Sequence, residues 1–421
     1  MGYYEAVKVR LDPTPKQERL MKSHAGAARF AYNAGLAHVK EALDNSEPAD
    51  WSHYSLLNWW NKSKDTLAVN RDTGVVWWSK NSKEAYNTAL HGLAQGFSNW
   101  SKSRKGQRKG RRVGFPKFKS KNTTMRFAYS TGFTAPKASD PYGLKLPRIG
   151  RVHCMENVHK RVAGARVIRM SVSRRAGRWY ASLTVERDSA APESVSEPNG
   201  DAVGVDLGVK NLATLSDGTV IPNHRALGAR LKALRKAQQA LNRKVMGSAR
   251  REKAKVRVAK LHARVADVRA DAIHKATAMI ARNYDTVCIE DLNVAGMMKN
   301  HRLARNLSDA ALGEFRRQLE YKTARNGVVL RVVDRWYPSS KTCSACGVVK
   351  AKLPLSERVF NCDACGASMD RDLNAAINIC VAGSAPETLN ARGGTVRRGS
   401  PSGHVALVPV KREPSRRRKA P

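Results

Sequence analysis

Three acidic residues, Asp206, Glu290 and Asp372, are spaced so that each can deliver a carboxylate from the end of a structural element. Asp206 and Glu290 each end a short apolar run of strand type, and Asp372 precedes the helix-forming segment 374–379. Singly, each would be an ordinary turn residue or helix cap. Together they offer the hard oxygen ligands that hold two divalent ions about 4 Å apart for hydrolysis of phosphodiester bonds. We therefore predict a nuclease site for Mg²⁺, or Mn²⁺, with Asp372 rather than Asp370 as the third catalytic carboxylate.

A second group of metal-binding residues consists of cysteines. Two Cys-x-x-Cys pairs are separated by fifteen residues, and a glycine follows each pair, as in the tight knuckles of a zinc ribbon. The four residues are Cys343, Cys346, Cys362 and Cys365. Because four thiolates close the coordination sphere, we predict one structural Zn²⁺ without a catalytic role. The other cysteines, Cys154, Cys288 and Cys380, are predicted to be small apolar side chains and are assigned no function.

The charge of the chain predicts a polyanionic partner. Its 421 residues include 76 Lys and Arg against 35 Asp and Glu, a net charge of +41. This excess favours nucleic acid. A membrane surface is the competing polyanion, but the basic residues spread along the whole chain and no run approaches about 20 apolar residues. The N-terminal residues lack an apolar signal segment, and seven cysteines with two close pairs argue against a secreted disulfide framework, so we expect a cytoplasmic protein.

The hydrophobic pattern changes along the chain. Residues 6–11 alternate as a strand does, and a cap at Thr14 followed by proline starts a helical region that reaches about residue 103. Residues 102–112 form a basic run that we interpret as a loop contacting phosphates. Short alternating segments from 114 to 187 predict a small barrel or sandwich, in which the 6–11 strand could be the first strand. Strands and long helices after residue 201 predict an α/β unit.

Several ordered motifs resemble those of the TnpB family, the OrfB proteins of bacterial insertion sequences. These motifs are Gly204–Thr214, Ile289–Leu292, Ser340–Gly347 and Asp370–Ile379, preceded by Arg29–Asn33 and Gly114–Phe118. The resemblance covers nearly the whole chain except the tail, and all three carboxylates of the family are present. It implies an RNA-guided DNA endonuclease related to the compact type V CRISPR effectors, with guide RNA and target double-stranded DNA as partners.

The resemblance also implies a multidomain α+β fold. Its parts are an RNase H-like (RuvC) α/β nuclease domain with an inserted zinc ribbon, and an N-terminal wedge-like β-barrel that carries a helical recognition lobe. We expect the barrel at 1–13 and 113–190, the recognition lobe and basic linker at 14–112, a linker at 191–200, the RuvC domain at 201–342 and 370–382, the zinc ribbon at 343–369 and a disordered basic tail at 383–421.

Contacts with nucleic acid are expected on the lobe and the basic linker. In the family, guide pairing reads most of the target, and the lobe reads a short flanking motif. Candidates on the lobe are Tyr32, Asn33, Lys83, Tyr86 and Asn87. The linker and the start of the barrel add the basic candidates Arg104, Lys105, Arg108, Arg111, Arg112, Lys117 and Lys119.

Two other functions fit part of the pattern. An RNA-guided DNA-binding repressor without nuclease activity would not need the intact set of carboxylates. A guide-independent RuvC-type transposase or resolvase would not need the large basic N-terminal half. A CRISPR effector of the same chemistry would differ only in genomic context. The resemblance places the protein in a prokaryotic cell, at the nucleoid when it is bound to DNA.

Overall fold

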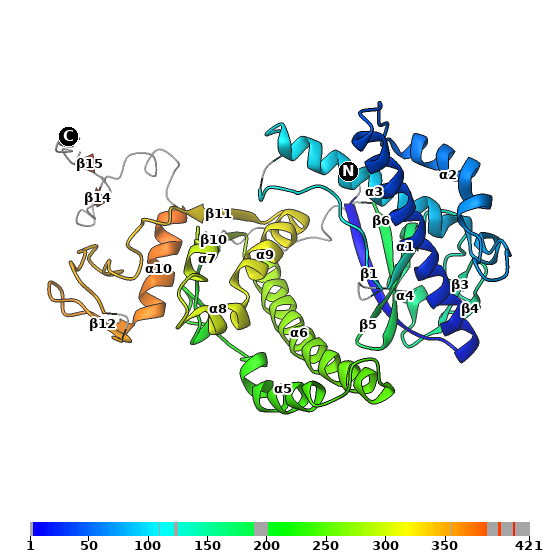
Figure 1. The fold of residues 1–421 in the computed structure, drawn as a ribbon. Coiled ribbons are helices and arrows are strands. Elements are labelled where there is room, and N and C mark those ends of the chain that lie inside the picture. The colour runs from blue at the N-terminus through cyan, green and yellow to red at the C-terminus, as the bar shows by residue number, and fades with distance from the viewer. Residues whose placement is uncertain are drawn as a thin grey trace. The chain divides into compact units, whose positions relative to one another are not determined.

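The computed structural model describes residues 3–108, 110–121, 125–188, 201–354 and 356–384, with two short strands at 395–396 and 407–408. The chain folds into two compact units, residues 1–190 with 255–260 and residues 191–254 with 261–421. Each unit has its own sheet and its own hydrophobic core (Figure 1). The predicted linker at 191–200 and most of the predicted tail at 383–421 lie outside the described residues.

The first unit contains a six-stranded antiparallel sheet in the order β2-β5-β6-β1-β4-β3. Its strands are β1 (Tyr3–Asp12), β2 (Arg126–Tyr129), β3 (Gly143–Leu146), β4 (Gly150–Cys154), β5 (Arg166–Arg175) and β6 (Arg178–Arg187), with helix α4 (Val158–Val162) before β5. β1 pairs with β6 along most of its length, so the helices that follow β1 are an insertion into this sheet. A bridge between Thr134 and Lys145 links the segment after β2 to the opposite edge strand, β3.

The inserted helices are α1 (Pro15–Asp44), α2 (His53–Leu67), the short 3-10 turn η1 (Trp78–Lys80) and α3 (Lys83–Arg104). The predicted cap of α1 is present: the Thr14 hydroxyl accepts from the Gln17 amide, and the Gln17 side chain accepts from the Thr14 amide. These helices share an aromatic core in which Trp60, Tyr86 and Phe97 are buried. Large rings supply the apolar area that three helices need in order to pack together.

The second unit contains a five-stranded mixed sheet in the order β11-β10-β7-β8-β9. Its strands are β7 (Ala202–Leu207), β8 (Asn211–Leu215), β9 (Val220–Pro222), β10 (Thr286–Glu290) and β11 (Val329–Val333). β7, β10 and β11 run parallel to one another, whereas β8 pairs antiparallel with both β7 and β9. The helices are α5 (Ala226–Asn242), α6 (Ala249–Asn283), α7 (Val294–Met297), α8 (Ala304–Ala310), α9 (Leu312–Asn326) and α10 (Arg371–Ser384).

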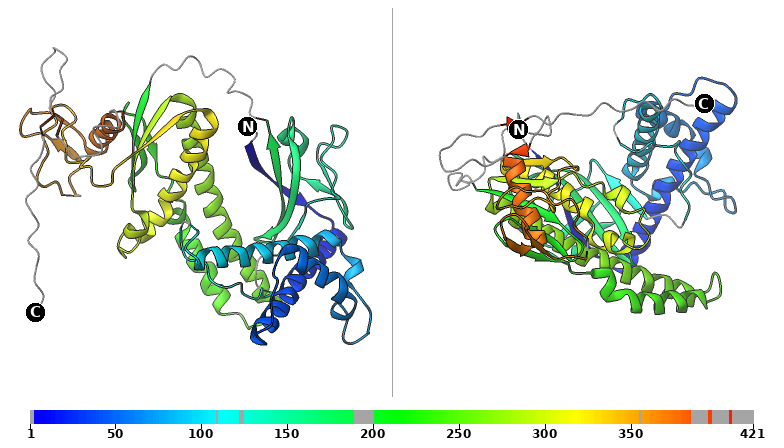
Figure 2. Two further views of the ribbon diagram at one scale, coloured as in Figure 1. Left: turned by 90° about the horizontal axis from the view of Figure 1, so that it is seen from above. Right: turned by 90° about the vertical axis from the view of Figure 1, so that its left-hand side faces the viewer.

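Different helices cover the two faces of this second sheet (Figures 1 and 2). On one face, Val205 and Ile289 share a core with Phe315 of α9 and with residues of α6. On the other face, Cys288 packs with Ile379 of α10. Because side chains alternate along a strand, each strand of the sheet contributes to both layers.

The segment between β11 and α10 carries the small antiparallel pair β12 (Val359–Asn361) and β13 (Ser368–Asp370). Two further short strands, β14 (Thr395–Val396) and β15 (Leu407–Val408), pair antiparallel with each other. Within the described ranges, no helix combines the length and the apolar character needed to cross a membrane.

Candidate active site

Strand alternation brings Asp206 and Glu290 to the face of the sheet that α10 covers. Gly204 of β7 pairs in register with Cys288 of β10, and Cys288 packs against α10. Asp206 and Glu290 each lie two residues further along these parallel neighbouring strands. Since every second side chain points to the same face, both carboxylates lie on the α10 side of the sheet.

Glycines allow α10 to approach this face unusually closely. A Cβ atom on Gly204 would lie 2.5 Å from the amide nitrogen of Cys380 and even closer to the carbonyl oxygen of Ala376. A Cβ atom on Gly383 would lie 2.7 Å from the Cβ atom of Cys288. Any larger side chain at either glycine would therefore push the helix away from the sheet.

Asp370 and Asp372, on either side of the first residue of α10, have different roles. The Asp370 carboxylate accepts hydrogen bonds from the backbone amides of Asp372, at 2.8 Å, and Leu373, at 3.2 Å, so it caps the helix. Asp372 lies in the first helical turn. Its carboxylate makes none of these capping bonds, which leaves it available to the cluster with Asp206 and Glu290.

Burial and neighbouring charges perturb the ionisation of Asp206 and Glu290. Burial and the neighbouring charges of Glu290 and Asp372 raise the pKa of Asp206 to about 7. Burial also raises the pKa of Glu290, against a hydrogen bond from the Ser339 hydroxyl that lowers it. The Arg371 charge lowers the pKa of Asp206 and offsets these effects only in part, and a divalent cation would supply further positive charge. The donor set, three carboxylates, fits the hard oxygen ligands that Mg²⁺ prefers.

Three residues that the sequence analysis did not single out hold this site together. Ser339, which is buried, donates its hydroxyl hydrogen bond to Glu290. Asn378 of α10 donates to the carbonyl oxygens of Ser339, at 2.8 Å, and Thr342, at 2.6 Å. Asn374 donates to the same Thr342 oxygen and accepts from the Ser344 amide at 2.9 Å. The one signal in the sequence is the spacing of the two asparagines, four residues apart, which puts both amides on one face of the helix.

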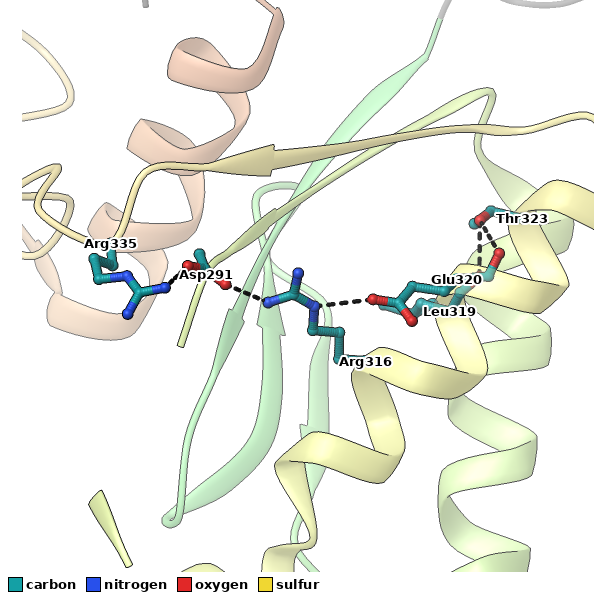
Figure 3. A network of polar contacts seen from close by, with 6 residues as sticks. All are labelled: Asp291, Arg316, Leu319, Glu320, Thr323 and Arg335. Atoms are coloured by element: carbon teal, nitrogen blue, oxygen red, sulfur yellow. Dashed lines mark hydrogen bonds and ion pairs between the residues drawn. The ribbon is translucent and has the colours of Figure 1, made fainter. Parts of the chain in front are cut away.

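A network of ion pairs fixes the residue that follows Glu290 (Figure 3). The Asp291 carboxylate accepts from Arg316 of α9 at 2.5 Å and also pairs with Arg335. Arg316 reaches Glu320 at 3.0 Å as well. The hydrogen bond from Arg316 lowers the pKa of Asp291 most, and the one from Arg335 lowers it further. Asp291 is therefore a charged structural residue, in contrast to Glu290 beside it.

The four predicted cysteines come together at one point. Their sulfur atoms all lie within 4.8 Å of one another, with Cys343 to Cys365 at 3.7 Å and Cys346 to Cys362 at 3.5 Å. A tetrahedral zinc–thiolate site requires sulfurs roughly 3.8 Å apart, so this cluster could hold a metal ion such as zinc. Among the described residues it is the one group of three or more possible ligands with such close ligand atoms. The carboxylate cluster is more open.

Three of the predicted nucleic-acid contacts meet on the first unit. The Asn33 amide pairs with the backbone of Lys119, donating at 2.9 Å and accepting at 2.8 Å. The Lys119 ammonium lies 3.4 Å from the centre of the Tyr32 ring. The structure thus joins Tyr32, Asn33 and Lys119 across a long separation in sequence.

The other candidates of the recognition lobe differ in exposure. Tyr86 is 1% exposed, stacks on Trp60 and donates to the Trp78 carbonyl at 2.8 Å, so its ring belongs to the core and is removed from the predicted contact surface. Lys83 is exposed, whereas Asn87 is partly buried and donates to Glu84 at 3.3 Å. The remaining basic candidates are all exposed: Arg104, Lys105, Arg108, Arg111, Arg112 and Lys117.

The fold has a counterpart among solved structures. A cryo-EM structure of a Cas12f1–sgRNA–target DNA complex matches with a TM-score of 0.50 and 15% sequence identity, over 90% of this chain and 99% of that one. At this identity the likeness concerns the fold alone. The chain therefore has a Cas12-like α+β multidomain fold with a cysteine cluster that could bind zinc.

Family models and relatives then identify the family. The model OrfB_IS605, described as "Probable transposase", matches residues 181–301, and the model "Cas12f1-like, TNB domain" matches residues 313–379. The "Helix-turn-helix domain" model of OrfB_IS605 matches residues 1–47, where the structure has β1 and the long helix α1.

Relatives match over almost the entire chain. The Mycobacterium tuberculosis H37Rv protein named "Putative RNA-guided DNA endonuclease Rv2885c" is 37% identical, covering 94% of this chain and 90% of that protein. A Streptomyces pristinaespiralis protein named "Putative RNA-guided DNA endonuclease" is 35% identical, with coverages of 98% and 96%. Escherichia coli K12 "Putative RNA-guided DNA endonuclease InsQ" is 30% identical, with coverages of 91% and 94%. The chain belongs to this TnpB (OrfB) family.

Proposed function

We propose that this protein is an RNA-guided DNA endonuclease that hydrolyses phosphodiester bonds of target DNA next to a short flanking motif. The observation that carries the proposal is the group of Asp206, Glu290 and Asp372, in which burial and the charges of the other two residues raise the pKa of Asp206, in a chain whose relatives, matched over nearly their whole length, bear that name. Partly buried clusters of acidic residues are destabilising and are typical of metal-dependent catalysis.

The proposed domain layout follows the sheet order. The mixed sheet β11-β10-β7-β8-β9, with two parallel and two antiparallel pairings, supports an RNase H-like (RuvC) nuclease domain. The segment with β12, β13 and the four cysteines is then a zinc ribbon with one structural Zn²⁺. The six-stranded sheet is the wedge-like domain, and α1 to α3 form the recognition lobe inserted into it.

Asp206, Glu290 and Asp372 are the residues proposed to hold Mg²⁺, or Mn²⁺, at the catalytic site. When bound, the metal would activate the attacking water and stabilise the charge on the leaving oxygen. The chain's own groups set the geometry: Ser339 fixes one oxygen of Glu290, and Asp370, by capping α10, leaves the Asp372 carboxylate free. Asn378 holds the backbone of Ser339, so the sheet and α10 are tied together around the carboxylates.

The charge of the whole chain supports nucleic-acid partners. The net charge of +41 is suited to holding guide RNA and target DNA together, and the exposed basic residues from Arg104 to Lys117 are proposed to contact phosphates. Asn33 and Lys119 are proposed to lie in the surface that meets the flanking motif, with the buried Tyr32 ring beneath the Lys119 ammonium.

The test uses protein expressed together with its native flanking DNA. Copurifying RNA is sequenced, and the complex is assayed on DNA that carries the matching target beside randomised flanking bases. We expect one discrete RNA species, Mg²⁺-dependent cleavage and a preferred flanking motif. Asp206→Ala should abolish cleavage while leaving target binding intact. Cleavage that survives RNase treatment would favour a guide-independent nuclease, and binding without cleavage by the wild-type protein would favour a repressor.

A further inference from the structure

Trp336 is an exposed aromatic side chain on the loop that leads into the candidate active site. It is 83% exposed, and among the described residues no large apolar side chain is more exposed. Leaving a ring of this size in water forgoes the free energy gained by its burial. Isolated exposed apolar residues are ordinary, so a role for Trp336 has to be argued from the loop that carries it.

The loop around Trp336 is held in place on both sides. The Trp336 amide donates to the Asp334 carboxylate at 2.8 Å, and Arg335 is paired with Asp291. On the other side, Tyr337 packs in the cluster that contains Val333, and its amide donates to the Asp334 carbonyl at 3.1 Å. Trp336 is thus the projecting side chain of an anchored loop, and little conformational entropy remains to be lost when a partner binds its ring.

Residues on either side of Trp336 connect its loop to Glu290 and to Asp291. Ser339, three residues further on, donates its hydroxyl to Glu290, and its amide bonds to the carbonyl of Tyr337 at 2.9 Å. On the other side, Arg335 is paired with Asp291, which follows Glu290 in the chain. Glu290 and its neighbour in the chain, Asp291, therefore contact the loop on the two sides of the exposed ring.

We propose that Trp336 is a stacking platform for one base of the DNA strand whose phosphodiester bond reaches the carboxylate cluster. An aromatic face accepts any base, as an enzyme that cuts many sequences requires, and stacking on it positions the adjacent phosphate. This role rests on the proposed function, because it assigns to Trp336 the substrate of that same site. It adds a substrate-binding residue that neither the carboxylates nor the cysteines supply.

The test combines removal of the ring with removal of the base. The RNA-loaded full-length protein cleaves targets in which a single abasic position is moved through the region of the cut. With wild-type protein, one position should lower kcat/KM roughly ten-fold, the size expected for a lost stacking contact. Trp336→Ala should lower kcat/KM by the same factor on intact DNA, and an abasic site at that position should not lower it further. Trp336→Phe should stay close to wild type.

Two controls separate stacking from other effects. Tyr321→Ala removes a ring in the same unit that is 40% exposed but already covered by the Arg317 guanidinium, and it should not alter the abasic profile. Trp336→Ala should melt at the wild-type temperature, since an exposed ring adds little to stability. The inference would be overturned if Trp336→Ala cleaved intact DNA as fast as the wild type, or if the losses from the variant and from the abasic site multiplied. A changed oligomeric state with an unchanged abasic profile would also overturn it.

Failure of the proposed function gives a different result. If wild-type protein cleaves nothing, affinity for a short fluorescein-labelled single-stranded DNA is compared between Asp206→Ala and the double variant with Trp336→Ala. A roughly ten-fold weaker affinity of the double variant would support stacking without cleavage. Equal affinities, or no binding by either protein, would overturn the stacking role as well.

Discussion

Gly204 of β7 lies against the backbone of Ala376 in α10, with no room between them for a side chain. Asp206 lies two residues beyond Gly204 on the strand, and Asp372 lies one helical turn before Ala376. Two strand residues span about 6.6 Å and four helical residues about 6 Å. The close contact between Gly204 and Ala376 therefore sets how near the Asp372 carboxylate comes to that of Asp206.

Gly204→Ala should displace α10 and disrupt the cluster. We expect a loss of stability of about 1–3 kcal/mol or more, because the clash is with backbone, and a larger loss of cleavage. Gly313→Ala is the matched control, since a Cβ atom at Gly313 in α9 meets nothing within 4 Å. Thermal unfolding and cleavage rates of both variants check this, and a fully active Gly204→Ala protein would contradict the account of how α10 is positioned.

Ser339→Ala should move the acidic limb of the pH–rate profile upward. The hydroxyl lowers the pKa of Glu290, so its removal raises that pKa, and the ionised carboxylate needed for metal binding is lost at a higher pH as the pH falls. At neutral pH we expect cleavage to slow about ten-fold. Ser339→Thr should restore part of the rate and the profile, and Ser340→Ala should keep both. Equal slowing of Ser339→Ala at every pH would instead indicate a purely structural effect.

Asp206→Asn should stabilise the metal-free protein at alkaline pH. Burial and the neighbouring carboxylates raise the pKa of Asp206 to about 7 in the folded state, whereas the ordinary pKa of an aspartate is 3.8. Between these values the folded state binds more protons than the unfolded state, so the contribution of this group to stability falls as the pH rises. The variant should exceed the wild type by on the order of 4 kcal/mol at pH 8 and match it below pH 4.

Addition of Mg²⁺ provides the control for this difference. A bound cation offsets the repulsion only in the protein that keeps the carboxylate, so Mg²⁺ should raise the melting temperature of the wild type more than that of Asp206→Asn. Melting curves over a pH series, with and without Mg²⁺, check both expectations. A difference between the proteins that does not vary with pH would mean that Asp206 is not the group that titrates.

Removal of the cysteine-bound metal should affect both stability and catalysis. Cys362→Ser should lose about one equivalent of zinc, measured by atomic absorption, because four thiolates are needed to close the site. Cleavage should fall too, since the Ser344 amide in the first cysteine knuckle bonds to Asn374 of α10. Cys154→Ser, which changes a buried cysteine of the other unit, should keep its zinc. Full zinc content in Cys362→Ser would refute the four-cysteine assignment.

Several features follow from local sequence and agree with the structure. The β1 strand, the capping box at Thr14 and the strands that end near Asp206 and Glu290 depend on side-chain alternation and on bonds between residues close in the chain. The two Cys-x-x-Cys pairs predict that their four sulfurs lie together. The tight turn of each pair and the preference of a metal ion for four sulfur ligands determine this arrangement.

Only the tertiary structure decided which side chains support the site. Ser339 and Glu290 are far apart in the chain and meet because Asn378 draws the loop onto α10, and no local pattern encodes such a contact. Tyr86 is one of the predicted nucleic-acid contacts of the lobe, but its ring lies in the core that the three helices share. Exposure behaves in the same way: the sequence shows a tryptophan at 336, whereas the packing of Tyr337 and the pairing of Arg335 determine that its ring projects into solvent. Burial depends on which elements pack together, and that depends on the whole chain.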